Sequence, residues 1–136
     1  MEALTHSLMG LGGFVAYFGI SVILLVAFKQ VYTWATPYDE FALIKEKNTA
    51  AAIGVSGAII GFCIAVAGAA SNSVSALDFA IWSIVALIAQ LFAFLIVRFF
   101  MPKIGDRIKA DEVPAGIVLA AVSVGVGLLN AACMTY

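Results

Sequence analysis

Four long apolar runs dominate the pattern of hydrophobic and polar positions along the chain. Residues 8–28, 50–70, 79–97 and 113–134 contain no Asp, Glu, Lys or Arg. Each run is close to the ~20 residues that a helix rising about 1.5 Å per residue needs to cross roughly 30 Å of hydrocarbon. A membrane strand alternates apolar and polar residues over about ten positions, whereas these runs are continuously apolar. The pattern therefore predicts an all-α membrane protein with four transmembrane helices.

The helices and their connections divide into two similar halves. The first half, residues 1–73, is predicted to contain helices at about 8–32 and 49–70, with a short helix at about 37–47 between them. The second half, residues 74–136, is predicted to contain helices at about 76–100 and 113–134.

The two halves also share sparse identities when the chain is compared with itself at an offset of 64 residues. Lys45 then coincides with Lys109, and Gly61 coincides with Gly125. The first and third helices would cross the membrane in the same direction. The sequence therefore predicts two tandem, parallel-repeat helical hairpins related by an axis along the membrane normal.

The basic residues indicate an orientation. All seven lie in two connections, between the first and second helices and between the third and fourth: Lys29, Lys45 and Lys47, and Arg98, Lys103, Arg107 and Lys109. Short loops rich in Lys and Arg stay in the cytoplasm. Both termini and the loop at 71–78 are therefore expected on the periplasmic or outer side.

The short helix in the first basic connection is predicted to be amphipathic. Thr36 and Pro37 are typical of a helix start, with Thr36 as the N-cap. One face of this helix would carry the apolar side chains of Tyr38, Phe41 and Ile44. The acidic side chains of Asp39 and Glu40 would lie mostly away from that face. We expect this segment to rest on the cytoplasmic membrane interface.

Small residues repeat every three or four positions in the second and fourth helices. Such stripes let helices approach closely, and the predicted packing residues are Gly54, Gly57, Gly61, Gly68, Gly116, Ala120, Ser123 and Gly127. They predict that the second and fourth helices form the packed centre. The contacts would lie either within one chain or between subunits, and a pore lined by small residues is the alternative.

Two amide side chains lie inside the predicted spans. Gln90 is near the middle of the third helix, and Asn130 is near the end of the fourth. A buried amide is costly unless it finds a hydrogen-bonding partner. We expect bonds between helices for both residues, with contact to an ion or substrate as the alternative.

Composition excludes several function classes. The chain is 64% hydrophobic and 11% charged, with a mean hydropathy of +1.11. Ionisable side chains within spans usually mark ion or proton pathways, and these four spans contain none of Asp, Glu, Lys, Arg or His. His6 is the only histidine, so no metal set or nucleophile–base pair can be assembled. We expect no enzyme activity, no cofactor, no metal and no nucleic-acid partner.

Two stretches of sequence resemble a known family. Thr36-Pro37-Tyr38-Asp39-Glu40, with Lys47-Asn48 and Ala50-Ala51-Ala52-Ile53, is similar to the signature of the YjfL-type bacterial inner-membrane family, domain of unknown function 350. The stretches from Ala115 to Ile117 and from Asn130 to Thr135 resemble a second copy of that domain. The resemblance implies a bacterial inner-membrane location and a tandem duplication. It implies no established activity, and neighbouring genes associate the family with envelope maintenance.

Two functions remain open at this stage. The first is a non-catalytic, homo-oligomeric structural or scaffold component in envelope homeostasis, embedded in the lipid bilayer. The short charged helix at 37–47 would recruit a cytoplasmic or membrane-remodelling protein. The alternative is a small channel or passive transporter, formed by an oligomer or between the second and fourth helices. A basic interface also suits anionic lipid headgroups.

Overall fold

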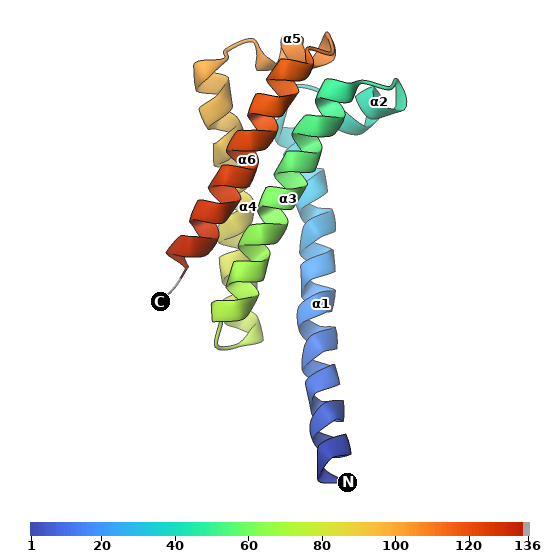
Figure 1. Cartoon of the computed structure of the whole chain (residues 1–136), viewed down its shortest axis with the longest axis vertical. Coiled ribbons are helices and arrows are strands. Elements are labelled where there is room, and N and C mark those ends of the chain that lie inside the picture. Colours follow the sequence, from blue (N-terminus) through green and yellow to red (C-terminus); the bar gives the residue numbers. More distant parts are fainter. Residues whose placement is uncertain (135–136) are drawn as a thin grey trace.

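The structure is a computed structural model that describes residues 1–134, and over that range it consists of six helices (Figure 1). They are α1 (Glu2–Ala35), α2 (Glu40–Lys45), α3 (Thr49–Asn72), α4 (Ala76–Phe100), α5 (Ile104–Lys109) and α6 (Val113–Cys133). Helices α1, α3, α4 and α6 are long and apolar enough to cross a membrane. The prediction of an all-α membrane protein with four spans is confirmed. Thr135 and Tyr136, at the end of the predicted second half, lie outside the described residues.

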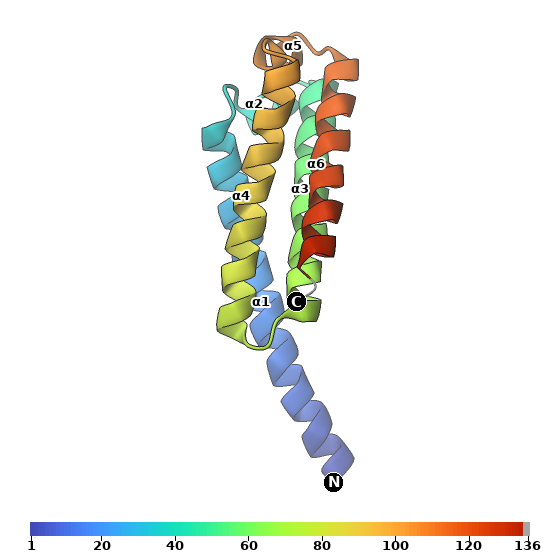
Figure 2. The same ribbon diagram turned by 90° about the vertical axis from the view of Figure 1, so that its left-hand side faces the viewer.

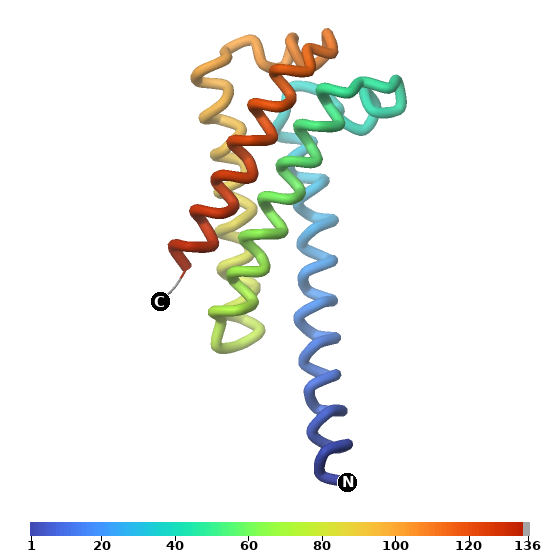
Figure 3. Tube along the Cα trace, in the orientation of Figure 1, coloured from blue at the N-terminus to red at the C-terminus, as the bar shows by residue number. Residues whose placement is uncertain are grey.

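Helices α3, α4 and α6 form the body of the molecule, and α1 leans against it. Helix α6 packs along α3, and both contact α4 (Figures 1 and 2). The short helices α2 and α5 lie together at one end, which we call the basic end (Figure 3). Only the part of α1 from Tyr17 onward contacts the body, while residues 1–16 are exposed. The N-terminal end of α1 projects past the α3–α4 turn (Figures 1 and 2).

Helix α1 is longer than the predicted span at 8–32. It contains 34 residues, which corresponds to about 50 Å. At its C-terminal end Thr36 has extended backbone, with φ −83° and ψ 148°. A residue before proline avoids the helical region, so Pro37 explains why the helix stops there.

The short helix α2 corrects the predicted helix at 37–47. It begins at Glu40, because the Asp39 carboxylate accepts hydrogen bonds from the backbone N–H groups of Phe41 at 3.2 Å and Ala42 at 3.3 Å. Thr36, predicted as the N-cap of this helix, instead ends α1. Tyr38 consequently lies outside the helix and contributes to no helical face.

The connections at the basic end share local features spaced 64 residues apart. Helix α5 begins and ends 64 residues after α2. The two non-glycine residues with positive φ in the described chain are Lys47 at 64° and Asp111 at 58°, with the same spacing. Each of these residues directly precedes the N-cap of a long helix, namely Asn48 for α3 and Glu112 for α6.

Hydrogen bonds join these two connections. The Asn48 Nδ2 donates to the carbonyl of Ile108 at 2.8 Å, while its Oδ1 accepts from Ala51 N at 2.8 Å. In return, Asp111 Oδ1 accepts from Ala50 N at 2.9 Å. The N-terminus of α3 is therefore capped from both halves of the chain, which fixes α3 next to α5.

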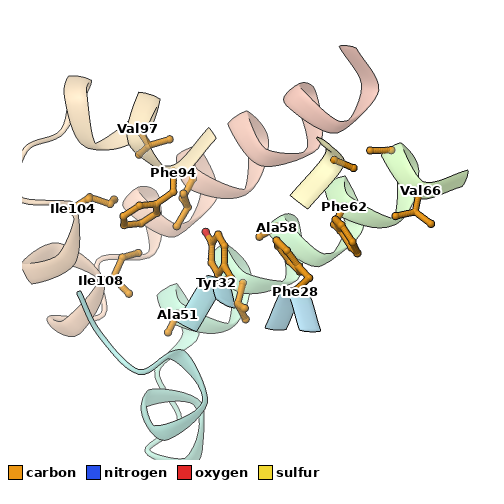
Figure 4. Packing of buried hydrophobic residues seen from close by; sticks show 14 of the residues in the cluster. Phe28, Tyr32, Ala51, Ala58, Phe62, Val66, Phe94, Val97, Ile104 and Ile108 are labelled. Atoms are coloured by element: carbon orange, nitrogen blue, oxygen red, sulfur yellow. The ribbon is translucent and has the colours of Figure 1, made fainter. Parts of the chain in front are cut away.

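An aromatic layer fills the space between α1, α3 and α4. The Phe28 ring stacks on Phe62 with centroids 4.5 Å apart, and the Tyr32 ring meets the edge of Phe94 at 6.1 Å. Tyr38 also contacts Phe94, at 6.4 Å. Figure 4 shows the layer beside the small side chains of α3, including Ala58. These rings attach the C-terminal half of α1 to the body.

Candidate functional site

The predicted small residues meet along one seam between α3 and α6. A Cβ on Gly57 would overlap Ala120 Cα, and a Cβ on Gly127 would overlap the carbonyl oxygen of Gly61. Both clashes are with backbone atoms. The two backbones are therefore in direct contact, which only glycine permits at these positions.

The same seam includes the other predicted packing residues. A Cβ on Gly54 would lie 2.9 Å from the Leu119 side chain, and one on Gly68 would lie 2.8 Å from Ala131 Cβ. A Cβ on Gly116 would overlap the Ala50 carbonyl. The sequence left open whether these contacts lie within a chain or between subunits. In the structure they lie within one chain, and they pack the two predicted hairpins against each other.

Gln90 crosses from α4 to this seam. Its fully buried side chain donates from Nε2 to the carbonyl oxygen of Ser123 at 2.9 Å. Gly61 leaves the space for this bond, since a Cβ there would lie 2.7 Å from Gln90 Nε2. The Gln90 Oε1 atom is buried without a hydrogen-bond partner among the described residues. Gln90 therefore bonds α4 to α6.

Asn130 behaves differently from Gln90. The residue is half-buried in α6, and its buried Nδ2 has no hydrogen-bond partner within the described part of the chain. The interhelical bond expected from this donor is absent there.

The unexpected polar group is Glu40, at the basic end. The sequence predicted it on the polar side of the short helix, but its side chain is only 1% exposed. Its Oε1 is hydrogen-bonded to the Thr36 hydroxyl, and its Oε2 has no partner among the described residues. The prediction was wrong because α2 begins at Glu40, after the N-cap Asp39, rather than at Pro37. In the resulting helix Glu40 is spaced with Leu43 and Ile44, which face the bundle.

Burial controls the titration of this group. Removal from water raises the pKa of the Glu40 carboxyl, hydrogen bonds from Thr36 partly oppose the rise, and the neighbouring Asp39 adds to it. Burial, and then Glu40, also raise the pKa of the Tyr38 hydroxyl. The Thr36 hydroxyl lies 3.0 Å from the Tyr38 carbonyl oxygen. The same hydroxyl lies 3.3 Å from the Thr33 carbonyl oxygen. Its single proton can serve only one of these acceptors, so a protonated Glu40 that donates to Thr36 leaves the Thr36 proton for a backbone carbonyl.

The polar groups described above can form hydrogen bonds, and the Glu40 carboxyl can bind a proton. Within residues 1–134, no three His, Cys, Asp or Glu side chains gather closely enough to hold a metal ion. The two cysteines, Cys63 and Cys133, are free and exposed. The site therefore consists of a closed glycine seam and, at the basic end, a buried carboxyl.

Comparison with known proteins gives one family. The family described as Domain of Unknown Function (DUF350) matches residues 5–134. The UPF0719 inner membrane protein YjfL of Escherichia coli strain K12 is 39% identical over 131 residues, which cover 96% of this chain and 99% of that protein. The protein of the same name from Escherichia coli O157:H7 matches with the same identity and coverage. No solved structure matches.

Proposed function

Because this chain belongs to the DUF350 family, has four helices that could span a membrane and is similar to inner membrane proteins of Escherichia coli, we propose that it is a non-catalytic, oligomeric structural component of the bacterial inner membrane that acts in envelope homeostasis. The observation that supports oligomerisation is the unpartnered N-terminal half of α1.

This half of α1 extends beyond the level of the other spans. The Tyr17 ring packs on Phe79, in the first turn of α4, with centroids 5.0 Å apart. The twenty residue steps from Asp78 to Arg98 in α4 cover about 30 Å, the thickness of the hydrocarbon. The apolar residues 8–16 of α1 therefore lie past the end of α4, where they would leave the hydrocarbon if α1 stood alone.

A second copy of α1 is the partner that suits this segment. Large apolar side chains are exposed along it, including Met9 at 74% and Phe14 at 59%. A Cβ on Gly10, Gly12 or Gly13 would meet nothing within 4 Å. Oligomerisation is one way for a helix to relieve hydrophobic mismatch, and glycines allow two helix backbones to approach closely.

Replacing Gly13 with leucine tests this proposal. We expect the wild-type protein to be a dimer or larger assembly in mild detergent, and Gly13→Leu to weaken self-association by about tenfold, since 1.4 kcal/mol of lost contact corresponds to that factor. Light scattering of the protein–detergent complex measures the mass. The matched control is Gly125→Leu on α6, where a Cβ also meets nothing within 4 Å. A monomeric wild type, or equal effects of both substitutions, would argue against association through α1.

The proposed orientation places the basic end in the cytoplasm and both termini in the periplasm. Alkaline phosphatase requires disulfide bonds that form in the periplasm, so a fusion after Tyr136 should be active. A fusion after Lys109, which follows three spans, should be inactive. The reverse pattern of activities would mean that the chain has the opposite orientation.

We also propose that the chain contains two tandem copies of one hairpin. The support comes from local features that lie 64 residues apart, the same offset that aligns the sequence identities. They are the short helices α2 and α5, the positive-φ residues Lys47 and Asp111, and the N-caps of α3 and α6. A cytoplasmic or membrane-remodelling partner would meet the exposed charges of this end, among them Asp39 and Lys45. In the alternative function, a passive channel, the path would run between copies, since backbone contacts fill the α3–α6 seam.

A further inference from the structure

A polar recess opens at the basic end, between the α1–α2 connection and the corner where α4 meets α5. Its volume is about 150 Å³, and it is lined by Pro37, Arg98, Pro102, Lys103, Ile104, Gly105, Asp106 and Lys109. Gly105 brings the two walls together, since a Cβ there would lie 2.7 Å from Pro37 Cγ. The recess is therefore a built concavity, formed by residues from both halves of the chain.

The recess carries an excess of two positive charges. Arg98, Lys103 and Lys109 line it together with a single carboxylate, Asp106. The one ion pair in residues 1–134, between Arg107 and Glu112 at 3.3 Å, does not use any of these three cations. By contrast, Lys29 of the first basic connection lies over the Phe41 ring, 4.7 Å from its centroid. An anion in the recess would meet three cations that no ion pair neutralises.

An apolar groove lies on the same stretch of α4. It has a volume of about 290 Å³ and is lined by Phe92, Leu95, Ile96, Phe99 and Phe100. Leu95 and Arg98 are three residues apart and are therefore neighbours on the helix surface. The eight residue steps from Phe92 to Phe100 extend about 12 Å along the helix, from the level of Arg98 into the hydrocarbon.

We propose that the recess and the groove together form a binding site for one anionic phospholipid. The phosphate would accept hydrogen bonds from Arg98 and the lysines, and one acyl chain would lie along the phenylalanines of the groove. Charge complementarity favours an anionic over a zwitterionic headgroup. The apolar groove favours a lipid over free phosphate. The site lies on α4 and α5, so it does not depend on association through α1.

Lipid retention by the purified full-length protein tests the site. Native mass spectrometry in detergent would compare adducts of dioleoylphosphatidylglycerol with those of dioleoylphosphatidylcholine. We expect preferential retention of phosphatidylglycerol by the wild type. The double variant Arg98→Gln, Lys103→Gln should reduce it roughly 30-fold, at about 1 kcal/mol per cation near a membrane surface. Phe99→Ala, which keeps every charge, should also reduce retention.

The matched control is Lys45→Gln, Lys47→Gln, which removes two exposed cations from the same end of the molecule. It should retain phosphatidylglycerol as the wild type does, and all variants should keep the wild-type unfolding midpoint. Equal retention of the two lipids, or an equal loss in both double variants, would overturn the proposal. A further measurement adds inorganic phosphate as a competitor of the lipid. Displacement of phosphatidylglycerol by an equal concentration of phosphate would identify the recess as a site for free phosphate instead.

Discussion

Replacing Gly127 with alanine will destabilise the folded protein by about 2–3 kcal/mol, the upper part of the range for overpacking a tight interior. The added methyl group would overlap the carbonyl oxygen of Gly61, which belongs to the α3 backbone and cannot rotate away as a side chain could. The helices must therefore separate along the seam, and the contacts on either side weaken with them. Thermal unfolding in detergent, followed by circular dichroism, measures the effect.

The same helix offers a matched control two residues away. A Cβ at Gly125 meets nothing within 4 Å, so Gly125→Ala makes the same chemical change without a clash. Alanine is a better helix former than glycine by about 1 kcal/mol, so this variant should be as stable as the wild type or more stable. If the two variants unfold at the same temperature, the backbone contact between α3 and α6 is not the close contact described above.

The contrast between these glycines shows what the sequence could and could not predict about the seam. Spacing by three or four predicts a stripe of small residues on a helix, and Gly57 and Gly61 form such a stripe. The spacing contains no information about which helix covers the stripe. Gly125, which coincided with Gly61 in the comparison of the two halves, lies in open space, while Gly127 contacts Gly61. The pairing depends on the rotation of each helix about its axis, which only the fold determines.

The four spans and the buried polar groups also differ in how far the sequence predicts them. The four spans could be predicted because a long run without charge has few other stable environments than lipid. The burial of Glu40 could not, because it depends on where α2 begins. Moving that start from Pro37 to Glu40 removes Tyr38 from the helix and places a carboxyl against the bundle. A sequence that offers two N-cap residues three positions apart, Thr36 and Asp39, does not by itself decide between them.

Replacing Glu40 with glutamine will stabilise the protein at pH 8 and have little effect near pH 4.5. Burial raises the pKa of Glu40 in the folded protein above the unfolded value. The folded state therefore binds the proton more tightly, and the stability gained from this group is fully present below the unfolded pKa. It is lost as the pH rises through the raised pKa. Glutamine has nearly the same shape and stays neutral throughout.

The size of the effect follows from the environment of the carboxylate. Once ionised, Glu40 keeps the hydrogen bond from Thr36 on Oε1, but its buried Oε2 has no hydrogen-bond partner among the described residues. Leaving a buried polar atom unpaired costs about 1–3 kcal/mol, and more when it is charged. We therefore expect the free energy of unfolding of Glu40→Gln to exceed that of the wild type by at least about 1 kcal/mol at pH 8. Thermal unfolding of both proteins from pH 4.5 to pH 8 gives the difference directly.

Other acids also titrate over this range, so the informative quantity is the difference between variant and wild type at each pH. Glu46→Gln is the matched control, since Glu46 is an exposed acid at the C-cap of the same helix. The stability difference between Glu40→Gln and the wild type should grow with pH by more than the difference for Glu46→Gln, because Glu40 is buried and Glu46 is exposed. A constant difference for Glu40→Gln would mean that the carboxyl reaches water, which requires the α1–α2 connection to leave the bundle. Because Pro37 in that connection also lines the basic recess, such an opening would change the recess as well.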